Sequence, residues 1–490
     1  MNPSPSPSPF QRFRLVARQE LRLLVRDRSL WLVGGLFLLL VGYALFNGML
    51  QTRQRDQAQA ALVAADSQAR ADQLAQLGRI MAGTELPTPF GNPANPANMA
   101  GGLGAQHAVM PSAPLAPVAL GQTDLFPAQF KVTHQSKVNF LHNNDIENPW
   151  HLQSGHFDLA FVVVYLLPLL IFTLSYNLLS GEREDGTLRL LLSQPLALPT
   201  LVAAKIAVRA AVLLGAAVLV PLAVLLIARP QALAAPGATL WWALVVGTYA
   251  LFWFTAVVAV NAFGWSSATN AMVLVIGWVV LVLVAPVLLN IAVTQASPAP
   301  SRAELAARTR VVTAQAMSHN AALLATDYTH VDQPDTLVPR GGRLAMSGRA
   351  MANYRIQRQV DETLQPELER FDAQQARQQA LVARWSAISP AAVAYEGITA
   401  LAGTGHSRNA WFLAQVASYH QAWKDFFYPR IDGGLALAEA DFPRIPAFYW
   451  REEGQGAVQA QAARAVLQLL LPTLALLGLA GWRLRRYRVE

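Results

Sequence analysis

The sequence predicts an all-α polytopic membrane protein with six transmembrane helices and two large, mostly helical extracytoplasmic domains. Hydrophobic residues make up 53% of its 490 positions and charged residues only 14%, against about 25% charged residues in soluble domains. Several apolar segments exceed the roughly 18 residues that mark a membrane-spanning helix. Basic residues gather beside these segments, at the two ends of the chain.

The six apolar segments predict the transmembrane helices: residues 30–50, 157–179, 198–228, 238–260, 268–294 and 462–482. Ahead of the first, residues 1–29 combine a disordered Ser-Pro tail with apolar residues at helical spacing between arginines. That pattern is typical of an interfacial amphipathic helix, and a plain basic extension of the first span is the alternative. Residues 483–490 form a short basic tail.

The basic residues also predict the orientation of the chain. Six arginines precede the first span and four follow the last, so the positive-inside rule places both termini in the cytoplasm, as six spans require. Residues 51–156 and 295–461 then lie outside, and together they carry a net charge of −1 in a chain of net charge +8. The positive charge therefore reflects topology and contact with anionic lipid, and nucleic acid is not expected as a partner.

The two outer regions differ in pattern. Residues 51–80 are polar, Ala/Gln-rich and helical by pattern, and a Pro/Gly/Asn-rich stretch follows. In the second region, residues 301–325 and 350–387 predict long amphipathic helices, and Pro366 is expected to kink or divide the latter. An aromatic cluster between Trp411 and Tyr428 predicts the core of an outer domain, with contact to lipid or a peptide as the alternative.

The chain lacks the motifs of an energy-coupling or catalytic site. None of its four lysines is followed by Ser or Thr, so there is no P-loop, and neither a His-Glu-x-x-His nor a Gly-x-Ser-x-Gly motif occurs. Charged residues deep in the predicted spans are almost missing, whereas a proton-coupled carrier needs them. No catalytic residue and no cofactor of its own are therefore expected.

A metal site is not expected either, although it stays open as an alternative. All nine histidines lie in the two outer regions, and imidazole suits copper and zinc. No pair of them has a tight ligand spacing such as His-x-His. The histidines are His107, His134, His142, His151, His156, His319, His330, His406 and His420.

Two groups of polar residues are associated with the second predicted span, one within it and one directly after it. Within it, Tyr165, Thr173, Tyr176 and Asn177 favour either a substrate path or ordinary helix packing. Directly after it comes a dense charged run, whose acidic residues suit the start of a short helix at the membrane surface; a solvated loop is the alternative. This run consists of Glu182, Arg183, Glu184, Asp185, Gly186, Thr187 and Leu188. By contrast, the uncharged turn from Asn261 to Asn270 is predicted to be structural.

The region around these residues resembles ABC-2-type exporter permeases. More narrowly, it is similar to their bacterial branch with large extracytoplasmic insertions, the DUF3526-type permeases. The matching residues are Asn148-Pro149, the run from Gly155 to Phe161, the run from Tyr165 to Leu169, and Glu182 to Leu188 continuing through Leu191 to Pro195.

The resemblance implies a permease subunit in a bacterial inner membrane, with the large domains in the periplasm. Residues 180–197 would hold a coupling helix for two ABC ATPase subunits, which would bind ATP and Mg. A second permease copy or a sister permease, membrane lipid and a periplasmic protein are the other expected partners. Two alternative functions stay open: mechanotransmission to a periplasmic partner without transport, and copper handling for enzyme maturation.

Overall fold

The computed structural model describes residues 8–121, 123, 126–138, 157–194, 196–230, 235–298, 301–324 and 334–487. Several residues named above lie outside this part of the chain. They are Asn148, Pro149, Gly155 and Pro195 of the family-like runs, and the histidines His142, His151, His156 and His330.

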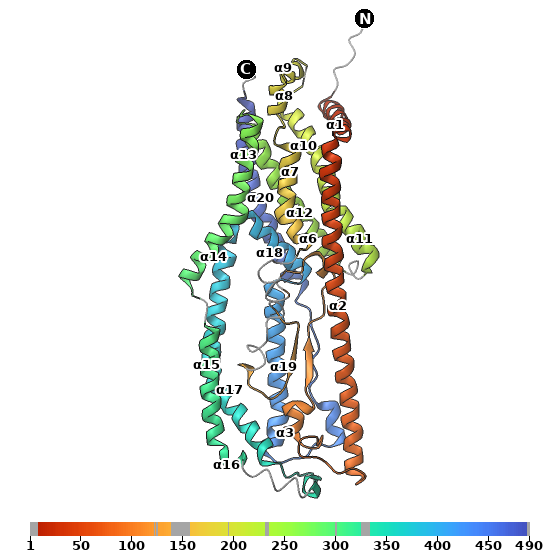
Figure 1. Cartoon of the computed structure of the whole chain (residues 1–490), viewed down its shortest axis with the longest axis vertical. Coiled ribbons are helices and arrows are strands. Elements are labelled where there is room, and N and C mark those ends of the chain that lie inside the picture. The colour runs from red at the N-terminus through yellow and green to blue at the C-terminus, as the bar shows by residue number, and fades with distance from the viewer. Residues whose placement is uncertain are drawn as a thin grey trace.

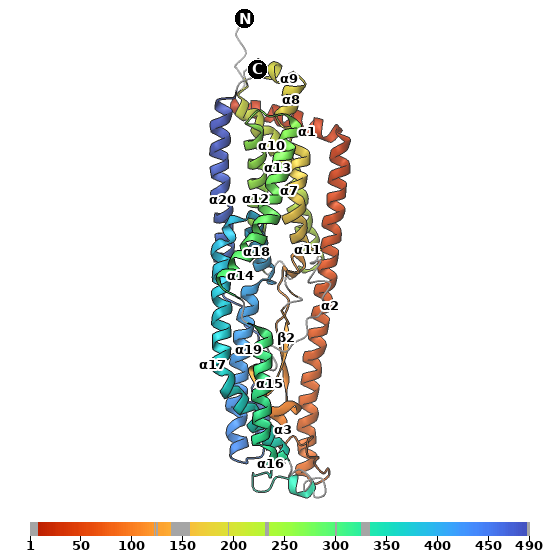
Figure 2. The ribbon, with the colours of Figure 1, turned by 60° about the vertical axis from the view of Figure 1, so that its left-hand side comes forward.

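The molecule is elongated, with a helical bundle at one end and a long helical domain at the other (Figures 1 and 2). Both chain termini lie at the free end of the bundle, called here the terminal end. The described residues contain six helices long and apolar enough to cross a membrane, which confirms the predicted fold class. These helices are Leu30–Met81, Leu159–Glu184, Leu198–Ala228, Pro236–Asn261, Ser267–Ala296 and Gly456–Arg485. Together, the first of them only as far as residue 50, they are called here the membrane bundle.

The chain begins with two helices that meet at Asp27. Helix α1 (Pro9–Arg26) starts at Ser8, whose Oγ accepts a hydrogen bond from the amide of Gln11 at 3.3 Å. Helix α2 (Arg28–Met81) has 54 residues, or about 80 Å at 1.5 Å per residue. It runs the length of the molecule (Figures 1 and 2), because the Ala/Gln-rich stretch after the predicted span consists of good helix formers.

Helix α12 (Pro236–Asn261) lies at the centre of the membrane bundle. Trp242, Tyr249 and Trp253 on this helix are fully buried. It packs against α7 (Leu167–Ser175), α20 (Gln455–Arg485), α10 (Leu198–Leu214) and α13 (Ser267–Trp278). The bundle also contains α6 (Leu159–Phe161), α11 (Val220–Ala228) and α14 (Ala285–Ala296).

Three of the spans contain a wide π-helical turn just before a proline. The turns are η3 (Val162–Leu166), η4 (Gly215–Leu219) and η6 (Val279–Val284), and Pro168, Pro221 and Pro286 follow them. Proline has no N–H and its ring clashes with the carbonyl four residues earlier, so a wider turn accommodates it. Each span thereby continues through its proline.

The wide turns release backbone carbonyls that side chains from other helices satisfy. Tyr249 donates its hydroxyl to the Val164 carbonyl at 2.7 Å, four residues before Pro168. Ser389 donates to the Leu281 carbonyl at 2.7 Å, five residues before Pro286. These two hydrogen bonds give each carbonyl oxygen a partner inside the membrane bundle, where an unpaired backbone group is costly.

Replacing Tyr249 with phenylalanine is expected to lower the free energy of unfolding by about 1–3 kcal/mol, because the buried Val164 carbonyl loses its partner. Thermal unfolding of the purified chain in detergent measures the effect. Tyr449→Phe is the matched control, since this tyrosine is 78% exposed. Equal unfolding temperatures for both variants would show that the hydrogen bond does not stabilise the bundle.

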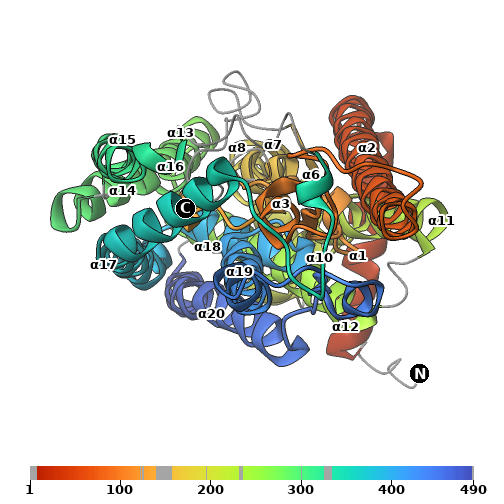
Figure 3. The same ribbon diagram turned by 90° about the horizontal axis from the view of Figure 1, so that it is seen from below.

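The other end of the molecule, called here the distal domain, comprises the described residues of 51–138 and 301–454. Viewed along the long axis, α2 and the pair α15 (Arg302–His319) and α17 (Gly348–Trp385) lie on opposite sides, with α19 (His406–Asp432) between them (Figure 3). Helix α17 runs unbroken through Pro366, so this proline does not divide it. The alternative, a kink at Pro366, stays a prediction. The shorter elements are α3 (Pro96–Asn98), η1 (Met99–Leu103), η2 (Ala116–Val118), α16 (Ala321–Leu324), η8 (Pro334–Leu337), η9 (Ser386–Ile388) and η10 (Glu439–Arg444).

The aromatic cluster forms the core of the distal domain. Phe412, Trp423 and Phe427 on α19 are fully buried. They pack with Phe130 of a two-stranded antiparallel sheet, β1 (Gln106–Val109) and β2 (Gln129–Val132). The sequence pattern had not indicated this sheet, since both strands lie in the irregular part of the first outer region.

Helix α18 (Pro390–Ala402) anchors the distal domain to the membrane bundle. It packs against α12 and α20, and Val393, Ala394 and Ile398 belong to the bundle's buried core. A Cβ atom on Gly397 would lie 3.1 Å from the Cβ of Ala465, so a larger residue here would require α20 to shift by a few tenths of an ångström. A movement of α12 or α20 in the bundle would therefore displace α18, which belongs to the distal domain.

Candidate functional site

Two short helices, α8 (Ser180–Glu184) and α9 (Thr187–Leu192), project at the terminal end of the bundle (Figure 1). Gly186 joins them with φ of 72°, a left-handed conformation that glycine adopts without a steric penalty. The Thr187 hydroxyl donates to the Glu182 carbonyl at 3.1 Å and also to the Glu182 carboxylate. The predicted charged run thus folds into a compact helical hairpin.

An ion pair ties this hairpin to α10. The Nζ atom of Lys205 lies 2.7 Å from the Oε1 atom of Glu182 and also donates to the Leu178 carbonyl at 3.5 Å. Lys205 is only 6% exposed. Because an ammonium group is costly to bury without a partner, this pair holds the start of α8 in place.

A second ion pair ties α1 to the same helix. The Nη2 atom of Arg209 lies 2.7 Å from the Oε1 atom of Glu20, and both residues are buried. Arg209 follows Lys205 by four residues, so both basic side chains project from the same side of α10. Helix α10 therefore connects α1 mechanically with the α8–α9 hairpin. Sequence reasoning missed this link, although Glu20 is the one acidic residue among the arginines of α1.

The turn between α12 and α13 braces the hairpin from the other side. Both the backbone amide and the hydroxyl of Ser267 donate to the Glu184 carboxylate at 2.7 Å. Asn261 accepts from the Leu179 amide at 3.1 Å, and the fully buried Asn270 donates to Ser180 Oγ at 3.2 Å. This turn, predicted as merely structural, thus positions the candidate site.

The outward side of the hairpin stays exposed. Leu188 is 1% exposed and anchors α9, whereas Leu190 is 72% exposed. We define the exposed tip as Asp185, Gly186, Thr187, Arg189 and Leu190, all of them exposed. Glu182, Arg183 and Glu184 bond to α10 or to the turn between α12 and α13. In the exposed tip Thr187 bonds back to Glu182, and Arg189 and Leu190 are the exposed side chains that another protein could contact.

The four candidate path residues on the second span do not converge on one point. Thr173 and Asn177 are exposed and four residues apart, so they share one face of the span. Tyr165 is half-buried, and the centre of its ring lies 4.9 Å from the centre of the Phe161 ring. Along the helix axis it is about 12 Å away from Thr173. The backbone carbonyl of Tyr176 accepts from Asn261 at 3.1 Å.

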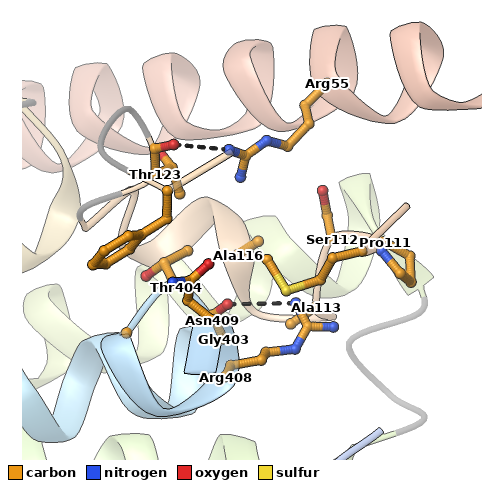
Figure 4. Close-up of a pocket in the computed structure, with 13 residues that line it drawn as sticks. Arg55, Pro111, Ser112, Ala113, Ala116, Thr123, Gly403, Thr404, Arg408 and Asn409 are labelled. Atoms are coloured by element: carbon orange, nitrogen blue, oxygen red, sulfur yellow. Dashed lines mark hydrogen bonds between the residues drawn. The ribbon is translucent and has the colours of Figure 1, made fainter. Parts of the chain in front are cut away.

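A small pocket lies where α2 meets the turn between α18 and α19 (Figure 4). Arg55 donates to the Thr123 carbonyl at 3.1 Å, and Arg408 pairs with Glu452 at 2.7 Å. The buried Oδ1 atom of Asn409 lacks a hydrogen-bond partner among the described residues. The cavity volume of about 20 Å³ is enough for one water molecule but not for a solute. We therefore regard this pocket as part of the junction between bundle and distal domain.

Among the described residues, no three His, Asp or Glu side chains come close enough to hold a metal ion. His107 lies 2.9 Å from the Asp66 carboxylate, and the His420 ring contacts the Gln135 carbonyl at 3.0 Å. His134 and His420 lie near each other, but among the described residues they belong to no group of three metal-binding side chains.

Two buried histidines are expected to make the distal domain sensitive to acid. Burial lowers the pKa of His134 to about 4, and burial together with Lys424 lowers the pKa of His420 to about 4. The unfolded pKa is about 6.5, so the folded state resists protonation. Their contribution to stability is complete above pH 6.5 and is lost as the pH falls toward 4.

For His134 alone, the expected loss of stability between pH 8 and pH 5 is about 2 kcal/mol. Thermal unfolding at both pH values checks this, with His134→Phe as the variant that removes the titrating group. A variant that loses as much stability as the natural chain would contradict the assignment.

A family model described as "ABC-2 family transporter protein" matches residues 14–487. Comparisons with curated proteins and with solved structures gave no match. The family match does not test the narrower DUF3526-type branch, which stays a prediction. Membership implies association with ABC ATPase subunits and a role as the membrane permease component of an exporter. Because the match spans nearly the whole sequence, the chain belongs to the ABC-2 family of transporter proteins.

Proposed function

We propose that the chain is the permease subunit through which two ABC ATPase subunits drive export, and that the exposed tip of the α8–α9 hairpin seats in the ATPase. The observation that carries the proposal is a contrast within the hairpin. Its inner residues are fixed by Lys205 and Ser267, whereas Leu190 at the tip is 72% exposed. A rigid element with a free outer surface suits transmission of force.

Force on the hairpin would reach several spans at once. The ion pairs of Glu182 and Glu20 with α10 would move α1 and the third span together. The Ser267 contact would engage the fourth and fifth spans. ATP and Mg would be bound by the partner subunits, and this chain would supply only the moving membrane part.

A second permease copy or a sister permease would complete the transporter. Thr173 and Asn177 form an exposed polar face. The Thr173 hydroxyl donates to the Leu169 carbonyl, whereas the Asn177 amide would be costly to leave in lipid. Facing another permease, the two side chains would line the substrate path. In this proposal the terminal end would lie on the cytoplasmic side of a bacterial inner membrane, and the distal domain would lie in the periplasm.

The structure also favours a second candidate function, mechanotransmission to a periplasmic partner. Helix α2 continues without a break from the terminal end into the distal domain. Near its far end Asp66 pairs with His107 at 2.9 Å, and Arg70 donates to the Phe442 carbonyl at 3.5 Å. A tilt of this helix in the membrane would therefore reach the distal domain directly.

Affinity purification of the tagged chain from its native membrane tests the leading proposal. We expect an ATPase subunit to co-purify, with magnesium-dependent ATP hydrolysis in the preparation. Reconstitution into vesicles then separates the two candidate functions, since transport requires ATP-dependent movement of a solute. Repeated purification without any ATPase would overturn both.

A further inference from the structure

The distal domain contains a cavity of about 300 Å³ that the proposed export cycle does not use. It lies between α17, the π-helical segment η1 and the loop after β2. A volume of this order is within the range of small-molecule sites. The lining residues are Phe90, Ala97, Asn98, Gly101, Leu103, His134, Gln135, Ala350, Asn353 and Gln357.

His134 is the unusual residue of this cavity. It is only 6% exposed, and neither its Nδ1 nor its Nε2 atom has a partner with hydrogen-bond geometry among the described residues. The backbone of Ala100 lies near the ring and acts to raise its pKa, but less than burial lowers it. A Cβ atom on Gly101 would lie 3.0 Å from the Cε1 atom of His134, so the glycine leaves room for the ring. Burying an imidazole with two unpaired nitrogens is unfavourable for folding alone.

The chemistry of the wall restricts what could pair with that imidazole. Because burial lowers its pKa to about 4, the ring is neutral at physiological pH, with one nitrogen donating and the other accepting. The remaining polar lining consists of carboxamides, which also donate and accept. Among them Asn353 is exposed, whereas Gln357 already accepts from the Ser136 amide at 3.0 Å.

No charged side chain is among the lining residues of this cavity. The guanidinium of Arg349 lies near the rim, 5.7 Å from the centre of the Phe90 ring. An ionised ligand would thus lose hydration without meeting an opposite charge inside the cavity. Apolar contact is available from Phe90 and Leu103.

We propose that this cavity binds a small neutral ligand whose hydroxyl or amide groups both donate and accept hydrogen bonds, with His134 as its central contact. Sugar units and peptide-like amides share this chemistry. The site lies outside the membrane bundle and is independent of the exposed tip.

A charge series of small probes tests the proposal on the full chain in lipid nanodiscs. N-acetylglycinamide is neutral, N-acetylglycine is anionic and N-acetylethylenediamine is cationic, and the three share the acetamide group and are similar in size. N-acetylglucosamine adds the hydroxyl-bearing source. Saturation-transfer NMR measures binding, and the unfolding temperature is recorded for each variant.

We expect at least one neutral probe to bind, and the two charged probes to bind at least tenfold more weakly. His134→Phe and Asn353→Leu should each weaken the neutral probe at least tenfold. His319→Phe, an exposed histidine at the end of α15, should not change binding. Without its probe, His134→Phe should unfold at neutral pH no lower than the natural chain, because neither ring nitrogen has a well-formed hydrogen bond within the described part of the chain.

Three kinds of result would overturn the proposal. The first is that neither neutral probe binds, which would indicate a cavity filled by water only. The second is that neutral and charged probes bind equally well, or that the neutral probe still binds to both His134→Phe and Asn353→Leu. Finally, a marked fall in unfolding temperature for His134→Phe at neutral pH would show that the imidazole serves the fold.

Discussion

Replacing Lys205 with methionine is expected to reduce ATP hydrolysis coupled to the permease at least tenfold. Lys205 is the cation that holds Glu182 at 2.7 Å and so fixes α8 to α10. Removing one partner from a buried ion pair costs about 3–5 kcal/mol, because the other charge is left unpaired. The Glu182 side chain is 25% exposed, so we expect a cost near the lower end of that range. The co-purified complex is assayed for ATP hydrolysis in nanodiscs.

Two further variants show whether the ion pair is responsible. Lys205→Met combined with Glu182→Gln removes both charges and should recover part of the activity. Lys137→Met is the matched control, since its pair with Asp372 is exposed and spans 3.4 Å. Coupled hydrolysis at the natural level in Lys205→Met would show that α10 does not hold the hairpin for this purpose.

Replacing Leu190 with aspartate is expected to weaken binding of the ATPase about 30-fold. Leu190 is 72% exposed at the centre of the exposed tip, and loss of one central apolar anchor costs about 2 kcal/mol in protein interfaces. The fold should be unaffected, because the side chain packs against little of its own chain. Titration of the permease with the purified ATPase measures the dissociation constant.

Leu86→Asp makes the same chemical change in the distal domain, where Leu86 is 58% exposed. We expect this control to bind the ATPase like the natural chain. An unchanged dissociation constant for Leu190→Asp would place the ATPase contact elsewhere on the terminal end.

Hydropathy and charge made the fold class predictable, because both are local properties of the sequence. Each apolar span can be recognised without knowing its neighbours, and the charged run after the second span indicated a surface element. The full length of α2 could not be predicted from hydropathy alone, because hydropathy marks only its apolar half. The polar half follows without a helix breaker. The structure shows the two halves as one helix of 54 residues.

The pairing of residues across helices could not be predicted in the same way. The contact between Glu20 and Arg209 depends on how α1 folds back at Asp27, where the backbone is extended with φ of −76° and ψ of 118°. Nothing in the hydropathy pattern specifies that angle. The bond from Tyr249 to the Val164 carbonyl likewise depends on the helix packing around Pro168.

The exposed tip had a partial signal in the sequence. The charged run marked the hairpin, but it did not show which of its side chains face outward. In the structure both carboxylates bond within the chain, and Leu190 occupies the exposed position. Only the left-handed turn at Gly186 decides which side of α9 points outward.

Site-specific cross-linking from position 190 tests the central claim most directly. The chain contains no cysteine, so Leu190→Cys introduces a single thiol for a short photo-activated cross-linker in native membranes. Met317→Cys, on exposed α15 in the distal domain, serves as the control. We predict one adduct with an ABC ATPase subunit from position 190 and none from position 317. No ATPase adduct from position 190, or the same adduct from both positions, would contradict coupling through the α8–α9 hairpin.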